Sequence, residues 1–318
     1  MRRRTRLALA AALALVLAAC TPEAPRLPPM DGPPPHRVWL PEEPPRAVVL
    51  ALHGFNDYSN AFERFGHYAA EHGVAVHAYD QPGFGAQRGA GRWPGIPALL
   101  AELRREHQRI VELHPERPVY LLGESMGAAV LIAAAARDEL PEVAGTILSA
   151  PAVWGGEQLN PIYRASLWLA VRFVPGLTLT GRDLGIMASD NIEMLRGLGA
   201  DPMVIKSTRI DAVAGLVALM DTAHVHAGAV PGPLLVLGGA QDQIVPPRAH
   251  AATLERLTAA PCTEVVYPDG WHMLLRDLQR QVVWDDILAW IDGEPLPSGH
   301  AGECGDSLSS VAARFDRS

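Results

Sequence analysis

Between residues 46 and 293, short apolar runs alternate with longer amphipathic segments. The short runs are rich in Val, Leu and Ala and end at turn residues, which is typical of buried strands. They predict strands at Ala47–Leu52, Val74–Tyr79, Val119–Leu122, Gly145–Ser149, Leu234–Leu237 and Glu264–Tyr267. The longer segments predict helices at Ala61–Glu71, Pro97–Leu113, Ser125–Arg137, Arg248–Ala259 and Asp277–Ile291. This alternation predicts an α/β domain, with a mostly parallel central sheet and helices on both faces.

Residues 152–230 interrupt the alternation and separate two core segments, 46–151 and 231–293. We predict that this insertion is a helical cap. It holds the apolar run Ser166–Val174 and several methionines: Met187, Met194, Met203 and Met220. Adaptable apolar side chains of this kind suit a pocket for an acyl chain. Most of them are nevertheless expected to pack the cap onto the core.

The motif Gly123-Glu124-Ser125-Met126-Gly127 lies between a predicted strand and a predicted helix. A G-x-S-x-G in this context is typical of a nucleophile elbow, which exposes a serine hydroxyl at the edge of a sheet. The strand and helix then approach so closely that a Cβ at position 123 or 127 would clash. Ser125 is therefore the candidate nucleophile.

A serine nucleophile needs a general base and an acid that orients the base, and on this kind of sheet they follow the serine in the order acid, histidine. Asp242 and His272 each lie just after a predicted strand, on the edge where open α/β sheets place their sites. Among the other acids, Asp269 lies in a turn, whereas Asp211 and Asp221 lie in helical sequence. We therefore predict the triad Ser125, Asp242 and His272.

The strand Ala47–Leu52 leads into His53-Gly54-Phe55. In this arrangement the backbone N–H of the residue after the nucleophile forms one half of an oxyanion hole, and an early loop forms the other half. Met126 and Phe55 are the predicted donors. For His53 we favour a structural hydrogen bond over a catalytic role, because His272 fits the position of the base better.

Together these motifs resemble the α/β-hydrolase superfamily and, within it, the branch of monoacylglycerol lipases and lysophospholipases. The similar segments cover residues 36–292 and comprise His53–Phe55, Asp80–Gly85, Gly123–Gly127, Ser149–Pro151, Gly239–Pro246 and Gly270–His272. The resemblance implies an α/β-hydrolase fold and a single-chain lipid ester as substrate. Two positions depart from the pattern: Glu124 replaces the usual histidine, and Arg88 matches its motif only approximately.

The N-terminus predicts a lipid-anchored protein of the bacterial cell envelope. Residues 1–19 combine a basic start with a short apolar stretch, and Leu17-Ala18-Ala19-Cys20 resembles a lipobox whose cysteine is diacylated. The alternative is an ordinary signal peptide followed by an incidental cysteine. Residues 20–45 are rich in proline and predict an extended tether, within which His36–Leu40 is either linker or an edge strand. Residues 294–318 predict a flexible tail.

Charge and cysteine content limit the possible partners. The net charge is −8, and without residues 1–19 it becomes −12, from 23 basic and 35 acidic residues. An acidic surface argues against a nucleic-acid partner. Cys262 and Cys304 either form a disulfide or remain unpaired. His224 and His226 lack further ligands nearby in the sequence, so no metal is expected.

These observations predict a membrane-tethered serine ester hydrolase that acts on monoacylglycerols or lysophospholipids and needs no cofactor. An acyltransferase or a peptidase on the same fold remains an alternative. So does a protein of another class, a lipoprotein that binds lipid without catalysis. The sequence leaves the oligomeric state open.

Overall fold

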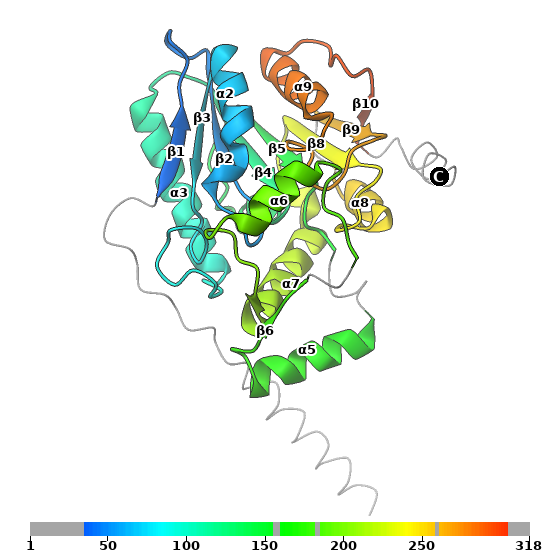
Figure 1. The fold of residues 1–318 in the computed structure, drawn as a ribbon. Coiled ribbons are helices and arrows are strands. Elements are labelled where there is room, and N and C mark those ends of the chain that lie inside the picture. The colour runs from blue at the N-terminus through cyan, green and yellow to red at the C-terminus, as the bar shows by residue number, and fades with distance from the viewer. Residues whose placement is uncertain (1–34, 155–159, 182–184, 258–260, 305–318) are drawn as a thin grey trace, which may run out of the picture.

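The computed structural model describes residues 35–154, 160–181, 185–257 and 261–304. In this part of the chain, eight strands form one sheet in the order β1-β3-β2-β4-β5-β8-β9-β10 (Figure 1). All neighbours from β3 to β9 are parallel, whereas β1 and β10 pair antiparallel at the two edges. The predicted mostly parallel sheet is confirmed. The strands are β1 His36–Trp39, β2 Ala47–Leu52, β3 Val74–Tyr79, β4 Val119–Glu124, β5 Gly145–Ser149, β8 Leu234–Gly239, β9 Cys262–Tyr267 and β10 Ala301–Glu303.

Alternating side chains of the buried strands build two apolar layers, one on each face of the sheet. On β2, Leu50 and Leu52 pack into one layer and Val49 and Ala51 into the other, as the period of a strand requires. The first layer is covered by α3 Ile96–Leu113, α4 Met126–Ala135 and α8 Pro247–Leu254. The second is covered by α2 Glu63–Glu71 and α9 Arg280–Asp292, which lie together in Figure 1.

The cap has three helices within its described residues. They are α5 Pro161–Phe173, α6 Ile192–Ala200 and α7 Ile210–Val225, with the short strands β6 Thr178–Leu179 and β7 Thr208–Arg209 paired antiparallel. Elsewhere in the described residues, 3₁₀ turns lie at Ser59–Phe62 in the core and at Ala227–Ala229 after α7. Helix α7 packs on α4 through Leu219 and Ala223 and joins the core. Helix α5 lies farther out, below α7 in Figure 1, and buries no residue.

Two edge strands correct the predicted domain boundaries. His36–Trp39 pairs with β3, so the core begins inside the predicted tether. Residues 294–304 are not a flexible tail, because β10 pairs with β9 and a disulfide joins Cys304 to Cys262. The structure thereby decides the cysteine pairing that the sequence left open.

The predicted signal peptide, Cys20 and tether residues 21–34 lie outside the described residues, as do residues 305–318. Among the helices of the described part, none combines the length and the apolar character needed to cross a bilayer. His224 and His226 lie at the C-terminal end of α7 and not on a strand, and His224 contacts the Thr253 hydroxyl at 3.3 Å.

Candidate active site

The turn after β4 holds Ser125 in the strained conformation that a nucleophile elbow requires. Its φ is 53° and its ψ is −109°, a region that residues other than glycine rarely adopt. A Cβ on Gly123 would lie 2.4 Å from the Ala128 nitrogen. A Cβ on Gly127 would lie 2.1 Å from the Leu52 carbonyl oxygen. The close approach of strand and helix that the two glycines predict is confirmed.

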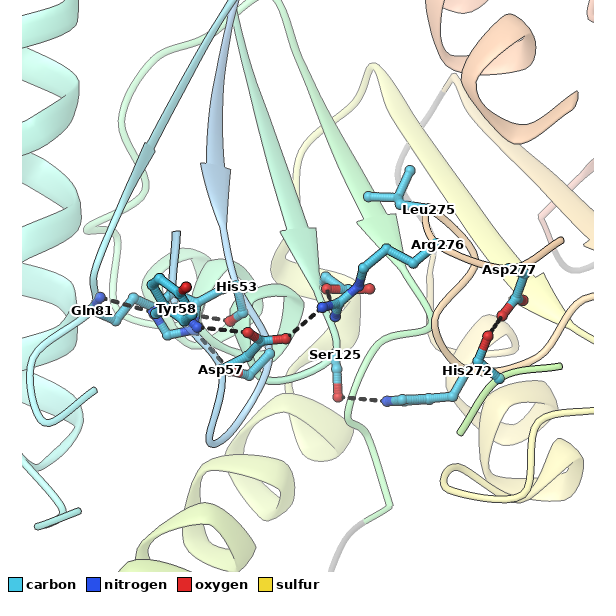
Figure 2. Close-up of polar contacts among 12 residues, drawn as sticks. His53, Asp57, Tyr58, Gln81, Ser125, His272, Leu275, Arg276 and Asp277 are labelled. Atoms are coloured by element: carbon cyan, nitrogen blue, oxygen red, sulfur yellow. Dashed lines mark hydrogen bonds and ion pairs between the residues drawn. The ribbon is translucent and has the colours of Figure 1, made fainter. Parts of the chain in front are cut away.

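The structure brings Ser125, His272 and Asp242 into one hydrogen-bonded line. The Ser125 hydroxyl donates to His272 Nε2 at 2.9 Å (Figure 2), and His272 Nδ1 donates to Asp242 Oδ2 at 2.8 Å. Asp242 Oδ1 accepts the backbone N–H groups of Ile244 and Val245 at 2.7 and 2.9 Å. Since an ionised carboxylate can only accept, the proton of the neutral ring lies on Nδ1 and Nε2 faces the serine. This is the tautomer that a general base needs.

Several charges act on the buried His272 ring. Burial is the largest influence and lowers its pKa, but the Asp242 carboxylate, its hydrogen bond and Glu124 together outweigh burial. Arg276 acts in the opposite direction to these carboxylates. The net result is a His272 pKa above the ordinary value of 6.5.

The other acidic candidates lie elsewhere. Asp211 pairs with Arg209 at the start of α7, and Asp221 lies farther along the same helix. The Asp269 carbonyl accepts the Gln279 side-chain amide at 2.8 Å, which ties down the turn before His272. These positions support the choice of Asp242.

The two predicted oxyanion donors lie on segments that flank Ser125. A Cβ on Gly54 would lie 3.5 Å from the Ser125 Cβ, so the loop that carries Phe55 passes directly beside the serine. Met126 is the first residue of α4. An N–H in the first turn of a helix has no carbonyl partner within that helix, so it can donate to an incoming oxygen. The role of Phe55 and Met126 as donors remains a prediction.

His53 has the structural role that the sequence favours. Its Nδ1 donates to the Gly54 carbonyl at 2.8 Å, and its Nε2 accepts the Gln81 N–H at 2.9 Å. The Gln81 side chain also donates to the His53 carbonyl at 2.7 Å, and Figure 2 shows the two residues side by side. Burial lowers the pKa of His53, which keeps its ring neutral. His53 thus fastens the loop that carries Phe55.

A pocket of about 360 Å³ opens at Ser125 and His272. Most of its wall is apolar and comes from both core and cap: Phe55, Ala152, Trp154, Ala188, Leu216, Met220, Ile244 and Val245. Of the cap methionines that we considered for an acyl pocket, Met220 lines it, whereas Met194 lines a second pocket beside α6. The run Ser166–Val174 lies on and just after α5 and does not reach the pocket. The prediction that a minority of these cap residues line an apolar pocket therefore holds for Met220 but not for Met194 or for the run Ser166–Val174.

Three charged residues that sequence reasoning did not connect form the polar part of this wall. Arg276 donates from Nη1 to Asp57 Oδ2 at 2.7 Å and from Nη2 to Glu124 Oε2 at 3.1 Å. All three side chains are buried. The one sequence signal was Glu124, an acid at the position where the family resemblance implies a histidine. Its partners could not be read from the sequence.

A second acid fixes the loop that carries His272. Asp277 accepts the Ser189 hydroxyl at 2.6 Å and the Trp271 N–H at 2.7 Å. Burial raises the pKa of Asp277 to about 6. The Met273 N–H donates to the Ala188 carbonyl at 3.1 Å. The cap segment around Ser189 is thereby bound to the loop that holds the candidate base.

Residues 43–279 match the family described as serine aminopeptidase, S33. The chain belongs to this family. The monoacylglycerol lipase of Mycolicibacterium smegmatis is 27% identical over 259 residues, which cover 80% of this chain and 91% of the relative. The human monoglyceride lipase is 23% identical, over 83% of this chain and 88% of its own length.

A solved structure of a monoglyceride lipase has a similar fold. A soluble variant of the Saccharomyces cerevisiae monoglyceride lipase superposes with a TM-score of 0.70 at 19% identity. The superposition covers 81% of this chain and 91% of the yeast chain. Together with the family match, this shows an α/β-hydrolase fold and identifies the chain as a serine hydrolase.

Proposed function

We propose that this serine hydrolase cleaves carboxylic esters of single-chain lipids, such as monoacylglycerols or lysophospholipids. The observation that carries the proposal is the hydrogen-bonded line of Ser125, His272 and Asp242 at the wall of an apolar pocket. A nucleophile, a base in the right tautomer and an orienting carboxylate are the groups that acyl transfer needs.

In this mechanism Ser125 Oγ attacks the ester carbonyl while its proton passes to His272 Nε2. The backbone N–H groups of Phe55 and Met126 stabilise the oxyanion of the tetrahedral intermediate. His272 then gives the proton to the departing alcohol, which leaves an acyl group on Ser125. Water that His272 deprotonates attacks this acyl group, and the intermediate collapses to the free acid and the serine hydroxyl. The reaction uses no metal or organic cofactor.

Two features support a lipid substrate. The pocket wall is mainly apolar, so each methylene of a bound acyl chain gains about 0.8 kcal/mol on leaving water. Helix α5 exposes apolar side chains, carries Arg164 and Arg172 and contains no acid. An apolar and basic helix on an otherwise acidic protein suits the surface of a lipid aggregate. The names of the relatives agree with this substrate class.

Two other functions fit the site less well, and an acyltransferase remains an alternative. A peptidase needs a group that binds an amine, but the buried carboxylates Asp57 and Glu124 are both engaged by Arg276, and the rest of the wall is largely apolar. An acyltransferase would use the same acyl-serine with an alcohol in place of water. A protein that only binds lipid does not require the hydrogen-bonded arrangement of Ser125, His272 and Asp242.

Hydrolysis of p-nitrophenyl esters of increasing acyl length by the purified protein tests the proposal. We expect kcat/KM to rise from acetate to medium chains and then level off where the pocket is full. A fluorophosphonate probe should label the wild type. Monoacylglycerol, lysophospholipid and aminoacyl-anilide substrates would then separate lipase from peptidase activity. An active enzyme that prefers acetate, or one that cleaves only the anilide, would contradict the lipid substrate.

We further propose that the mature protein is held on a bacterial membrane by a diacylated Cys20, with residues 21–35 as spacer. More than one acyl chain is needed for stable anchoring, and the acidic mature chain would be repelled by anionic head groups. The full-length protein should therefore stay with the membrane fraction in high salt, whereas Cys20→Ser should not be lipidated. Mass spectrometry of the mature N-terminus tests this, and an unmodified N-terminus would contradict it.

A further inference from the structure

Arg276 joins three segments of the active site. Its guanidinium binds Asp57, two residues after Phe55, and Glu124, the residue directly before Ser125. Arg276 itself lies four residues after His272. Figure 2 shows its side chain extending from the His272 loop toward Asp57. One planar group thus connects the segments that carry the candidate oxyanion donor, nucleophile and base.

Further hydrogen bonds hold two members of this cluster. Asp57 Oδ1 accepts the Tyr58 N–H at 2.9 Å, and the Arg276 carbonyl accepts the Asn191 side-chain amide at 2.9 Å. The Arg276 side chain is almost fully buried. Buried charge-assisted hydrogen bonds are short and strongly directional, and removing one partner leaves the others uncompensated. We therefore expect a change at Arg276 to affect all three segments.

We propose that Arg276 is a positioning residue, which aligns the Phe55 loop, Ser125 and His272 for the reaction without touching the reacting atoms. This inference rests on the proposed ester hydrolysis. Its chemical basis is the two-pronged guanidinium, since a lysine at this position would keep the charge but could not hold both carboxylates in one plane. Small misplacements of reacting groups are costly, because the rate depends on their mutual geometry.

The test compares Arg276→Lys with Arg209→Lys. Arg209 makes a similar two-pronged contact with Asp211 in the cap, away from the pocket, and serves as the matched control. With a soluble p-nitrophenyl ester, we expect Arg276→Lys to lower kcat by ten- to hundredfold with little change in KM. An alkyl boronic acid binds well only when the serine and the oxyanion hole are correctly placed relative to each other, so its affinity should fall together with kcat. Arg209→Lys should change neither quantity.

Two milder variants cover the case in which Arg276→Lys does not fold. Glu124→Gln keeps the shape of the side chain but weakens its contact with Arg276, so kcat should fall. The variant also removes a charge that raises the pKa of His272, so the acid limb of the pH–activity profile should move to lower pH. Asp57→Asn should lower kcat and boronate affinity. The charged groups acting on His272 are Asp242, Glu124 and Arg276, so Arg276→Gln should move the limb in the opposite direction to Glu124→Gln.

The outcomes separate the two proposals. A wild type that is inert toward esters and toward the fluorophosphonate would contradict ester hydrolysis itself. An active wild type whose folded Arg276→Lys, Glu124→Gln and Asp57→Asn variants keep their kcat and boronate affinity would overturn the positioning role. A loss of thermal stability without loss of kcat would reduce Arg276 to a structural ion pair and would also overturn it.

Discussion

The C-terminal edge of the sheet and helix α5 of the cap are built in opposite ways. At the edge of the sheet, polar groups such as Asp242, His272 and Arg276 are buried and hydrogen-bonded to one another or to backbone. Helix α5 has no buried residue, and it exposes Ile162 at 71% and Phe173 at 75%. The first region loses its geometry if one partner is removed. Helix α5 has no such network of buried partners, and its apolar side chains are exposed.

The arrangement of exposed residues on α5 sharpens this contrast. Ile162, Leu169 and Phe173 are spaced so that they share one face of the helix, whereas Leu167 and Val171 lie on the opposite, less exposed face. A helix that is apolar on both faces is normally buried in a core or a membrane. Contacts between α5 and α7 account for one face. The comparison agrees with our proposal that the edge of the sheet performs the chemistry and that the outer face of α5 contacts lipid.

Removing the nucleophile should have the largest effect. Ser125→Ala should lower kcat on a soluble ester by about four to six orders of magnitude, because members of a triad act as a unit. His272→Ala should be nearly as severe and Asp242→Asn somewhat milder. Steady-state kinetics with a contaminant-free sample measures this, and circular dichroism checks the fold. Retention of most activity in Ser125→Ala would exclude the proposed mechanism.

Alanine substitutions in the sheet and in α5 should differ in their effect on the free energy of unfolding. Leu121 on β4 is fully buried, so Leu121→Ala should lower the free energy of unfolding by about 2–5 kcal/mol through lost burial and a cavity. Leu169 on α5 is 48% exposed, so Leu169→Ala should cost less than about 0.5 kcal/mol. Urea unfolding of both variants makes the measurement. Equal losses would mean that α5 packs as firmly as the sheet.

Charges placed on the outer face of α5 should affect only lipid-borne substrate. Phe173→Asp and Ile162→Asp should each reduce turnover of a long-chain monoacylglycerol in anionic vesicles by about ten- to hundredfold, because each loses roughly 1.5–3 kcal/mol of apolar burial in the interface. Hydrolysis of a soluble short ester should not change. Leu113→Asp provides the control, since Leu113 is 54% exposed at the end of α3 and lies outside the cap. An equal loss in the control, or a loss on the soluble ester, would contradict a lipid-facing role.

The smallest effect concerns pH. The His272 pKa lies above its ordinary value of 6.5 because its neighbouring carboxylates favour the charged ring. A protonated His272 cannot accept the Ser125 proton, so kcat/KM on a soluble ester should fall as the pH falls through this pKa. The acid limb should therefore lie above 6.5. A limb that lies lower would show that burial outweighs the carboxylates.

Local patterns in the sequence determined much of the core. The strands Ala47–Leu52, Val74–Tyr79 and Gly145–Ser149 have the predicted bounds, because a short apolar run between turns has few other stable places in an α/β domain. The conformation of Ser125 was equally readable, since only a very tight turn needs glycine on both sides of it. Chain order and the ends of strands were enough to select Asp242 and His272.

Only the tertiary structure decided which distant residues became neighbours. Arg276 is 219 residues from Asp57 and 152 from Glu124, and in the sequence it resembles any exposed arginine. The run Ser166–Val174 resembles a pocket wall in composition, but it lies on and beside the exposed helix α5. The pairing of Cys262 with Cys304 depended likewise on β10 returning to β9. Periodicity and turn residues indicate contacts between residues a few positions apart in the sequence. Burial and charge pairing depend on the whole fold, which brings distant residues together and cannot be inferred from local patterns.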